Sequence, residues 1–271
     1  MIITLPNIDP VAFSFSFIAV RWYSLAYIFG ILFTFSWLKY GNKSQKFLSE
    51  KALDDWMIFA ILSIILGGRF GYVLFYNSSY FLSHPLEIFA FWQGGMSFHG
   101  GLFGAIFGMW LFAKKYKINF WILCDNLAVS APFGLLLGRI ANFINLELYG
   151  RPTFANFGVI FPNSDGLPRH PSQLYEAGLE GIILLLILMI LYFKTNIKNF
   201  PKKLSGIFLA GYGISRFIVE YFREPDPQIG FLFDTITMGQ ILSFPLIFLG
   251  FLLIFSNFKK ITKNTRIITN N

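Results

Sequence analysis

The sequence predicts an all-α polytopic membrane protein with seven transmembrane helices, and three observations support this fold class. Hydrophobic residues make up 55% of the 271 residues. Charged residues make up 13%, about half the roughly 25% of an ordinary soluble domain. The apolar residues also fall into seven runs, each long enough to cross a hydrocarbon layer about 30 Å thick. A soluble fold could not bury this much apolar surface.

The predicted spans follow from a search for about 20 consecutive, mostly apolar residues. The first run is too long for the apolar core of a signal peptide, and no Lys or Arg precedes Arg21, so we expect it to remain as a span. The seven predicted spans are Ile18–Leu38, Trp56–Tyr76, Met96–Ala113, Phe120–Leu137, Gln173–Phe193, Leu204–Phe222 and Ile236–Phe255.

The basic residues predict the orientation of these spans. All 14 lysines, together with Arg266, lie in the segments after spans one, three, five and seven. Because cytoplasmic loops carry an excess of Lys and Arg, these segments are expected inside, the N-terminus outside and the C-terminus in the cytoplasm. The other basic residues are Arg21, Arg69, Arg139, Arg151, Arg169, Arg216 and Arg223. They either snorkel at helix ends or hold anions, because a guanidinium can clamp a phosphate through two hydrogen bonds.

The segments predicted outside the membrane are of two kinds. Residues 77–92 contain aromatic side chains and no Lys or Arg, which is typical of an arm that lies in the membrane interface. Residues 148–171 are rich in Gly and Pro and predict a small extracytoplasmic head between spans four and five. We expect residues 1–271 to form a single integral membrane domain, and no internal repeat is evident.

Two clusters of ionisable residues lie inside predicted spans, where such residues are costly and usually functional. In Gly138–Gly150, Arg139, Asn142 and Asn145 recur every three residues and Glu147 follows. These groups either satisfy the last carbonyls of a helix or form a ligand site.

In span six, Arg216, Glu220 and Arg223 follow i, i+4, i+7 spacing on one helix face. This spacing fits a structural ladder of ion pairs. It also fits a carboxylate that holds two arginines in place for a ligand phosphate.

Two further candidates could move a proton. His99 lies in the glycine-rich segment Trp92–Gly101, where it is either a hydrogen-bonded structural residue or a base that works near neutral pH. Tyr23, at the start of span one, is the second candidate. Glu176 and Glu180, one turn apart at the start of span five, are expected only as supporting carboxylates.

These residues leave two classes of function open. The first is an enzyme that acts on a phosphate-bearing lipid, and the second is a transporter or channel for an anionic lipid or phosphate compound. Nucleic acid is not an expected partner, because apolar runs interrupt the basic residues. No spaced Cys and His cluster predicts a metal site, and no cofactor is expected.

The motifs resemble those of the bacterial prolipoprotein diacylglyceryl transferases along nearly the full chain. The segment GRIANFINLELYG matches the family signature, and Leu146 stands in it where many relatives have Gly. The other matching blocks, in the same order, are GGRFGYVLFYN, GGMSFHGG, HPSQLYE and GYGISRFIVEYFREPD. The resemblance implies a multi-pass enzyme of the bacterial inner membrane that takes part in lipoprotein biosynthesis. It would transfer the diacylglyceryl group of phosphatidylglycerol to the lipobox cysteine of a prolipoprotein, with the active site toward the outer side.

Such a transfer needs a base for the thiol and cationic donors for the leaving phosphate. We expect His99 to lead Tyr23 as the base, Asn142 to be a neutral donor, and Glu147 and Glu220 to orient the arginines. The resemblance implies that Arg139 binds phosphatidylglycerol. The residues predicted to bind this lipid are Arg139, Arg216, Asn142 and Gly150. The expected partners are phosphatidylglycerol, the lipobox segment and membrane lipids.

Overall fold

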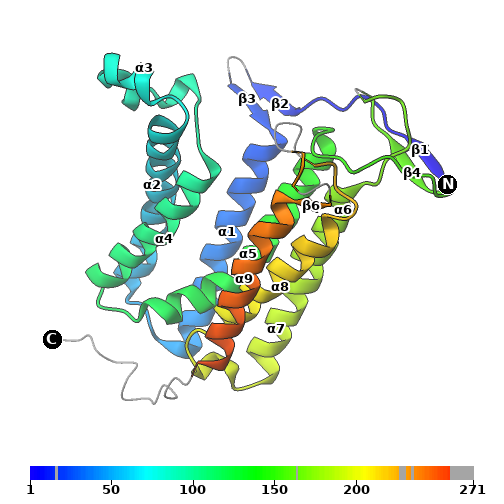
Figure 1. Ribbon diagram of the computed structural model, residues 1–271. Coiled ribbons are helices and arrows are strands. Elements are labelled where there is room, and N and C mark those ends of the chain that lie inside the picture. Colours follow the sequence, from blue (N-terminus) through cyan, green and yellow to red (C-terminus); the bar gives the residue numbers. More distant parts are fainter. Residues whose placement is uncertain (16–17, 163, 226–229, 233–234, 257–271) are drawn as a thin grey trace. The chain divides into compact units, whose positions relative to one another are not determined.

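The computed structural model describes residues 1–15, 18–162, 164–225, 230–232 and 235–256 (Figure 1). Contacts among them divide the chain into two compact units. The described residues of the first unit fall within Met1–Trp37 and Cys124–Thr262, and those of the second within Leu38–Leu123. Whether both belong to one membrane domain, as the sequence predicts, stays a prediction.

Helices form the body of the first unit. Pro132 lies inside α5, and a π-helical segment, η3, separates α6 from α7. Because a π turn is wider than an α turn, it changes which side chains face the neighbouring helices, and such turns are frequent at functional sites. The helices that lie wholly or mostly in this unit are α1 (Trp22–Gln45), α5 (Phe120–Ile144), α6 (Ser172–Glu176), η3 (Ala177–Ile183), α7 (Leu184–Lys194), η4 (Ile197–Asn199), α8 (Lys203–Val219) and α9 (Met238–Phe255).

The mostly helical character agrees with the predicted fold class, but the all-α prediction misses three short two-stranded sheets found among the described residues. Strand β1 (Ile2–Thr4) pairs in parallel with β4 (Gly158–Ile160), so the N-terminal strand joins the head. Strands β2 (Val11–Phe15) and β3 (Ile18–Arg21) are antiparallel, as are β5 (Phe231–Leu232) and β6 (Ile236–Thr237). The first helix therefore begins at Trp22 rather than at the predicted Ile18, because Ile18–Arg21 pairs as a strand.

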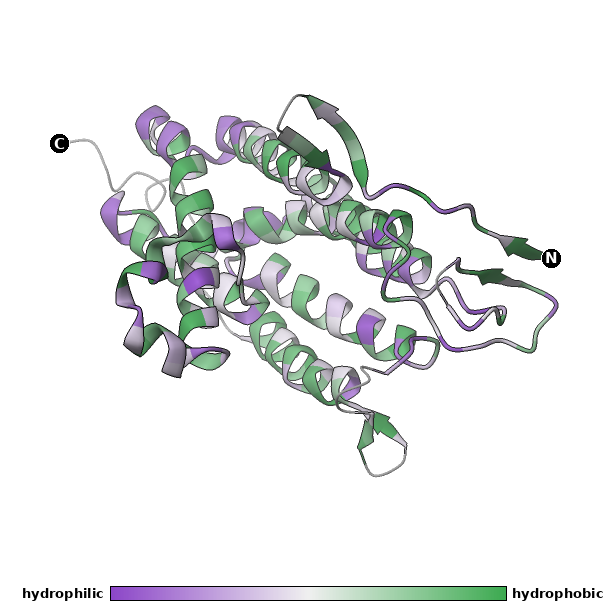
Figure 2. Ribbon diagram, turned by 90° about the horizontal axis from the view of Figure 1, so that it is seen from above, coloured by the Kyte–Doolittle hydropathy of each residue, from purple (hydrophilic) through white to green (hydrophobic). Residues whose placement is uncertain are grey.

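Helices long and apolar enough to cross a membrane account for four of the predicted spans. They are α2 (Glu50–Phe75), α5, the continuous segment Ser172–Lys194 and α9. Hydrophobic residues predominate on many turns of the helices in the view from above (Figure 2). The other predicted spans correspond to α1, α4 (Phe98–Lys115) and the 17-residue α8. These three helices are shorter or less apolar than the four above. The predicted number of seven spans is thus only partly supported.

The apolar core of the first unit lies where α7 ends and α8 begins. Tyr192 and Leu204 are about 1% exposed, and Val129 and Leu188 are fully buried with them. The ring of Trp37 packs edge-on against Tyr192, with centroids 4.9 Å apart. This packing fixes α1, α5, α7 and α8 at the lysine-rich end of the helices, away from the head.

In the second unit, glycines bring α2 and α4 into backbone contact. A Cβ at Gly71 would lie 2.6 Å from the Cα of Gly100. A Cβ at Gly104 would lie 2.7 Å from the Cα of Gly67 and would overlap the carbonyl oxygen of Ser63. Small residues at such crossings let helix backbones approach closely, which strengthens van der Waals contact in a membrane.

We expect Gly104→Ala to destabilise the protein by about 1–3 kcal/mol, because the added methyl group must push α4 away from α2. Gly101→Ala is the matched control on the same helix, since its Cβ would meet only ordinary contacts at 3.7 Å and beyond. Thermal unfolding in detergent measures both. Equal melting temperatures for the two variants would contradict close packing at Gly104.

The predicted arm consists of short helical turns, α3 (Ser78–Ser83), η1 (Pro85–Phe89) and η2 (Phe91–Gln93). Leu86 and Trp92 are 84% and 83% exposed, which fits an arm that meets lipid. Arg69 is almost fully buried beneath it and donates to the carbonyls of Ile88 at 2.9 Å and Glu87 at 2.6 Å. Arg69 therefore binds protein backbone, a role outside the two expected for the arginines of the non-cytoplasmic segments.

Candidate active site

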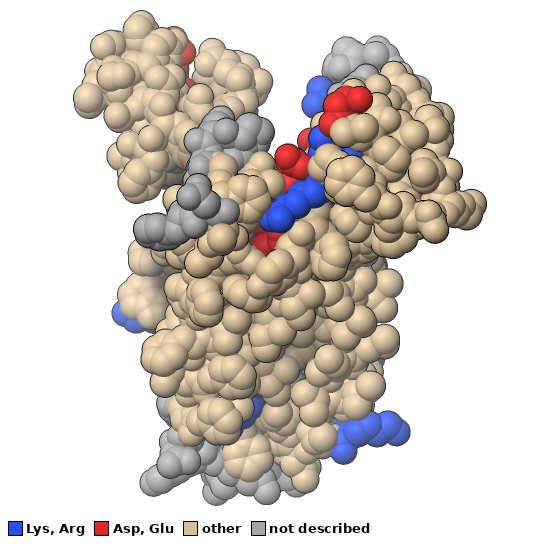
Figure 3. All heavy atoms as spheres, turned by 45° about the vertical axis from the view of Figure 1, so that its right-hand side comes forward, with Lys and Arg blue, Asp and Glu red and all other residues tan. Residues whose placement is uncertain are grey.

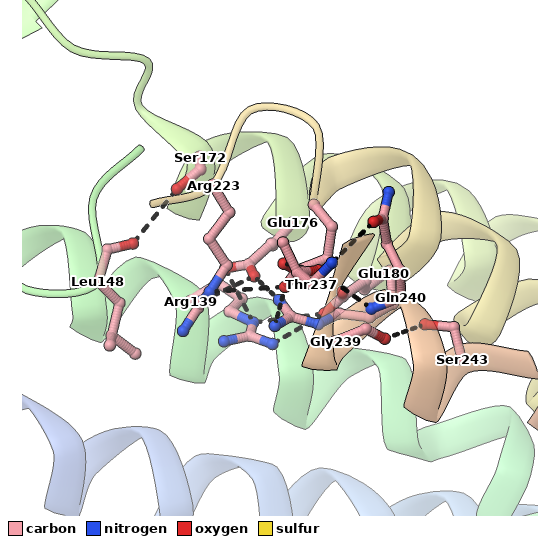
Figure 4. Close-up of polar contacts among 12 residues, drawn as sticks. Arg139, Leu148, Ser172, Glu176, Glu180, Arg223, Thr237, Gly239, Gln240 and Ser243 are labelled. Carbon is pink, nitrogen blue, oxygen red and sulfur yellow. Dashed lines mark hydrogen bonds and ion pairs between the residues drawn. The ribbon is translucent and has the colours of Figure 1, made fainter. Parts of the chain in front are cut away.

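A cluster of three arginines and three glutamates lies at the head end of the first unit (Figure 4). Its members come from α5, from the segment that starts with α6, and from α8 and the turn after it. These three segments are far apart in the sequence and meet only in the fold. The cluster comprises Arg139, Glu176, Glu180, Arg216, Glu220 and Arg223.

Glu176 is the centre of the cluster. Its Oε1 accepts hydrogen bonds from Arg216 Nη1 and, at 3.2 Å, from Arg223 Nη1. Its Oε2 lies 3.4 Å from Nε of Arg139. The Glu176 side chain has no exposed surface, so one buried carboxylate joins three guanidinium groups.

Arg139 and Arg216 each have a second carboxylate partner. Arg139 donates to Glu180 Oε2 from Nη2 at 3.1 Å and from Nε at 3.3 Å. Arg216 pairs with Glu220 through Nη2, and Arg223 Nε lies 3.7 Å from the same Glu220 oxygen. The predicted ladder of ion pairs among Arg216, Glu220 and Arg223 is therefore confirmed, and Glu176 from another segment extends it.

The exposed side of the cluster is cationic although its formal charges balance. The side chains of Arg139 and Arg216 are each 17% exposed, whereas those of Glu176 and Glu180 are fully buried. On the face drawn in Figure 3, charged side chains gather toward the head, and an uncharged belt separates them from basic side chains at the opposite end. Guanidinium groups held from behind by carboxylates can bind a phosphate from the open side.

The end of α5 brings together three predicted site residues, Tyr23, Asn142 and Glu147. Glu147 N–H donates to the carbonyl of Asn142 at 3.1 Å, and Leu146 N–H donates to that of Phe143 at 3.1 Å, which is a Schellman cap. This cap folds Glu147 back over the helix end, where it accepts from Asn142 Nδ2 at 3.2 Å. Asn142 also donates to the hydroxyl of Tyr23.

Glu147 was expected to orient an arginine, and its side-chain hydrogen bonds correct that expectation. They come from the amides of Asn142 and Asn145, the latter at 3.4 Å. The carboxylates beside Arg139 are instead Glu176 and Glu180. The reason is the cap, which turns Glu147 toward the amide groups and away from the guanidinium.

Leu146 occupies the cap position that favours glycine. Its φ is +60°, in the left-handed region that costs an L-residue about 1–2 kcal/mol. We expect Leu146→Gly to raise stability by about 0.5–1 kcal/mol, because relief of this strain exceeds the extra freedom of glycine in the unfolded chain. The melting temperature should rise by about 2 °C. Leu146→Ala keeps the strain and is the control; a lower melting temperature for the glycine variant would refute the argument.

Gly150 marks a backbone crossing. Its N–H donates to the carbonyl of His170 at 2.9 Å, and its own carbonyl accepts from Arg169 Nη1 at 3.0 Å. A Cβ at this position would lie 2.8 Å from the Cβ of His170 and would overlap the carbonyl of Phe222. Gly150 therefore holds three segments together beside the cluster. Its predicted contact with lipid stays a prediction.

His99 belongs to the second unit, in the first turn of α4. Its side chain is exposed, and its ring lies edge-on to Phe98 with centroids 5.6 Å apart. An exposed imidazole keeps water access and can exchange protons, as a base requires.

A family model described as prolipoprotein diacylglyceryl transferase matches residues 10–256. The chain belongs to this family. A phosphatidylglycerol--prolipoprotein diacylglyceryl transferase of Rickettsia rickettsii (strain Sheila Smith) is 53% identical over 251 residues, which cover 91% of this chain and 96% of the relative. A Rickettsia bellii (strain OSU 85-389) protein with the same description is 51% identical over 250 residues, 91% of this chain and 94% of the relative.

In this family member, the direct contacts of two glutamates with Arg139 were not predicted from the sequence. Glu176 and Glu180 were expected only as supporting carboxylates, yet they contact Arg139 directly. The signal that could have ranked them higher is their place in an apolar run, because an ionised carboxylate inside a span needs a partner charge. The sequence alone could not identify Arg139 as that partner, because it lies 37 residues from Glu176 and 41 from Glu180 in the chain.

Proposed function

We propose that this chain transfers the diacylglyceryl group of phosphatidylglycerol to the lipobox cysteine of prolipoproteins. Its relatives carry that activity in their names, and the observation that carries the proposal is the arginine cluster, whose guanidinium groups are partly exposed while their carboxylate partners are buried. Within the described part of the chain, Nη1 of Arg139 donates to no protein group, so it is free to bind a lipid phosphate.

The reaction is an alkyl transfer. The cysteine sulfur forms a thioether bond to the glycerol carbon, the bond from that carbon to the phosphate oxygen breaks, and glycerol 1-phosphate departs. The thiol proton passes to a base. Arg139 and Arg216 neutralise the charge that grows on the leaving phosphate, with Asn142 as a neutral donor, because preplaced donors stabilise developing charge most effectively.

His99 is the preferred base. Tyr23 accepts a hydrogen bond from Asn142 and lies beside the Glu147 carboxylate, to which its own hydroxyl can donate. A phenol engaged in this way orients groups and does not readily accept a proton. The exposed imidazole of His99 has a ring nitrogen that can take the thiol proton.

The proposed topology is a seven-span protein of the bacterial inner membrane, with the N-terminus and head outside and the C-terminus in the cytoplasm. The excess of lysines after alternate spans supports this orientation. The pairing of β1 with β4 supports a common side for the N-terminus and the head. The active site would then lie toward the outer side, where phosphatidylglycerol and the lipobox segment meet.

Purified protein in detergent, given phosphatidylglycerol and a lipobox peptide, tests the proposal. We expect a peptide heavier by one diacylglyceryl group, and a peptide with Ser in place of the lipobox Cys should gain no mass. No mass shift, together with flux of phosphate compounds in sealed vesicles, would instead favour a transporter or channel.

A further inference from the structure

We propose that Thr237 is a positioning residue for the transfer reaction, because it fixes Glu220 and, through Glu220, the guanidinium groups of Arg216 and Arg223. The inference rests on the proposed function. It adds α9, which carries no charged residue in its first turn, to the elements that build the site.

The two oxygens of Glu220 have separate partners. Oε1 pairs with Arg216 Nη2 and lies 3.7 Å from Arg223 Nε. Oε2 accepts a hydrogen bond of 2.8 Å from the hydroxyl of Thr237. Glu220 is 2% exposed and Thr237 3%, so little water reaches this bond. The carboxylate is thus held from both sides, by arginines on one and by a hydroxyl on the other.

The Thr237 hydroxyl also accepts a hydrogen bond from α9, and this bond determines where its proton points. It caps α9, because its oxygen accepts from Gln240 N–H at 3.2 Å, while the Gln240 side chain accepts from Thr237 N–H at 3.1 Å. A hydroxyl has one proton. With the oxygen used as an acceptor by the helix, the single proton goes to Glu220.

The first turn of α9 also excludes other positions for the carboxylate. A Cβ at Gly239 would lie 3.0 Å from Glu220 Cγ and would overlap its Oε1. The positive end of the α9 dipole attracts a negative charge held this close. Contact with backbone on one side and a directed hydroxyl on the other leaves Glu220 one orientation.

Loss of the Thr237 hydroxyl would leave Glu220 anchored by the arginines alone, so Arg216 would sample more orientations. Because Arg216 acts on the leaving phosphate, the effect should appear in kcat more than in the KM for phosphatidylglycerol. We expect Thr237→Val to lower kcat about fivefold, the order of one lost hydrogen bond.

Three variants separate positioning from helix capping. Thr237→Ser keeps both hydrogen bonds and should retain the wild-type kcat. Thr237→Val removes both. Gln240→Ala removes the other half of the capping box without touching Glu220, so it should lower the melting temperature but leave kcat unchanged. Should Thr237→Val not fold, Thr237→Ala is the second variant, because it also removes the hydroxyl that donates to Glu220 and should lower kcat to a similar extent.

The outcomes distinguish a failure of the positioning role of Thr237 from a failure of the proposed transfer activity. A wild-type kcat for Thr237→Val, or an equal loss of kcat for Gln240→Ala and Thr237→Val, would overturn the positioning role. The absence of transfer by the unmodified protein would instead overturn the proposed function. A kcat restored by Ser and lost with Val, at a KM within about twofold of the wild type, supports the inference.

Discussion

Glu176→Gln is expected to lower kcat for diacylglyceryl transfer at least a hundredfold, which corresponds to about 2.7 kcal/mol of transition-state stabilisation. Glu176 is the only carboxylate that contacts Arg139, Arg216 and Arg223 together within the described residues. The amide that replaces it carries no charge, so the three guanidinium groups would share the two remaining carboxylates, Glu180 and Glu220. Removing one partner from a buried ion pair costs about 3–5 kcal/mol.

Two measurements are needed, because the same change lowers stability. The melting temperature in detergent reports the loss of the ion pairs, and kcat per folded molecule reports the loss of arginine orientation. The net charge of the cluster becomes more positive, so the KM for phosphatidylglycerol should not rise in proportion. A kcat within about threefold of the wild type would show that Glu176 serves stability alone.

Asp125→Asn is the matched control for this prediction. Asp125 is 4% exposed, and its Oδ1 accepts from the backbone N–H of Ser205 at 2.8 Å and from the Ser205 hydroxyl at 2.6 Å. It is therefore a buried carboxylate that caps α8, outside the arginine cluster. We expect this variant to melt at a lower temperature and to keep its kcat.

The sequence was sufficient to predict the helical membrane fold where hydropathy decides the structure. The span predicted at Ile236–Phe255 is found as Met238–Phe255. The pairing of Ile2–Thr4 with Gly158–Ile160 was missed, because each strand depends on a partner more than 150 residues away. No local pattern contains that information.

The same distinction applies to the site. The contacts of Glu220 with Arg216 and Arg223 could be predicted, because helix periodicity alone brings residues three and four apart together. The contacts of Glu176 could not, since they join α6 to α5 and α8. Glu147 turns back toward Asn142 because residue 146 has a left-handed backbone conformation. A glycine usually predicts such a helix end, and this sequence has a leucine there.

Arg139→Lys is expected to lower transfer at least tenfold although it keeps the positive charge. Arg139 presents two nitrogens, Nε and Nη2, to Glu180 and retains Nη1 for a ligand. A lysine has a single ammonium group, which cannot span both carboxylates and a phosphate in this planar arrangement. The variant therefore loses at least one charge-assisted hydrogen bond, worth about 1.5–3 kcal/mol.

The substrate whose KM changes in Arg139→Lys shows whether Arg139 contacts the lipid or the peptide. If Arg139 holds the lipid phosphate, Arg139→Lys should change kcat and the KM for phosphatidylglycerol, while the KM for the lipobox peptide stays the same. Arg69→Lys is the control, because Arg69 also spans several acceptors but they are backbone carbonyls of the arm. It should lower the melting temperature and leave the KM for phosphatidylglycerol unchanged. If Arg139→Lys raises the KM for the peptide but not that for phosphatidylglycerol, Arg139 contacts the protein substrate rather than the lipid phosphate. Arg216 would then be the principal phosphate ligand.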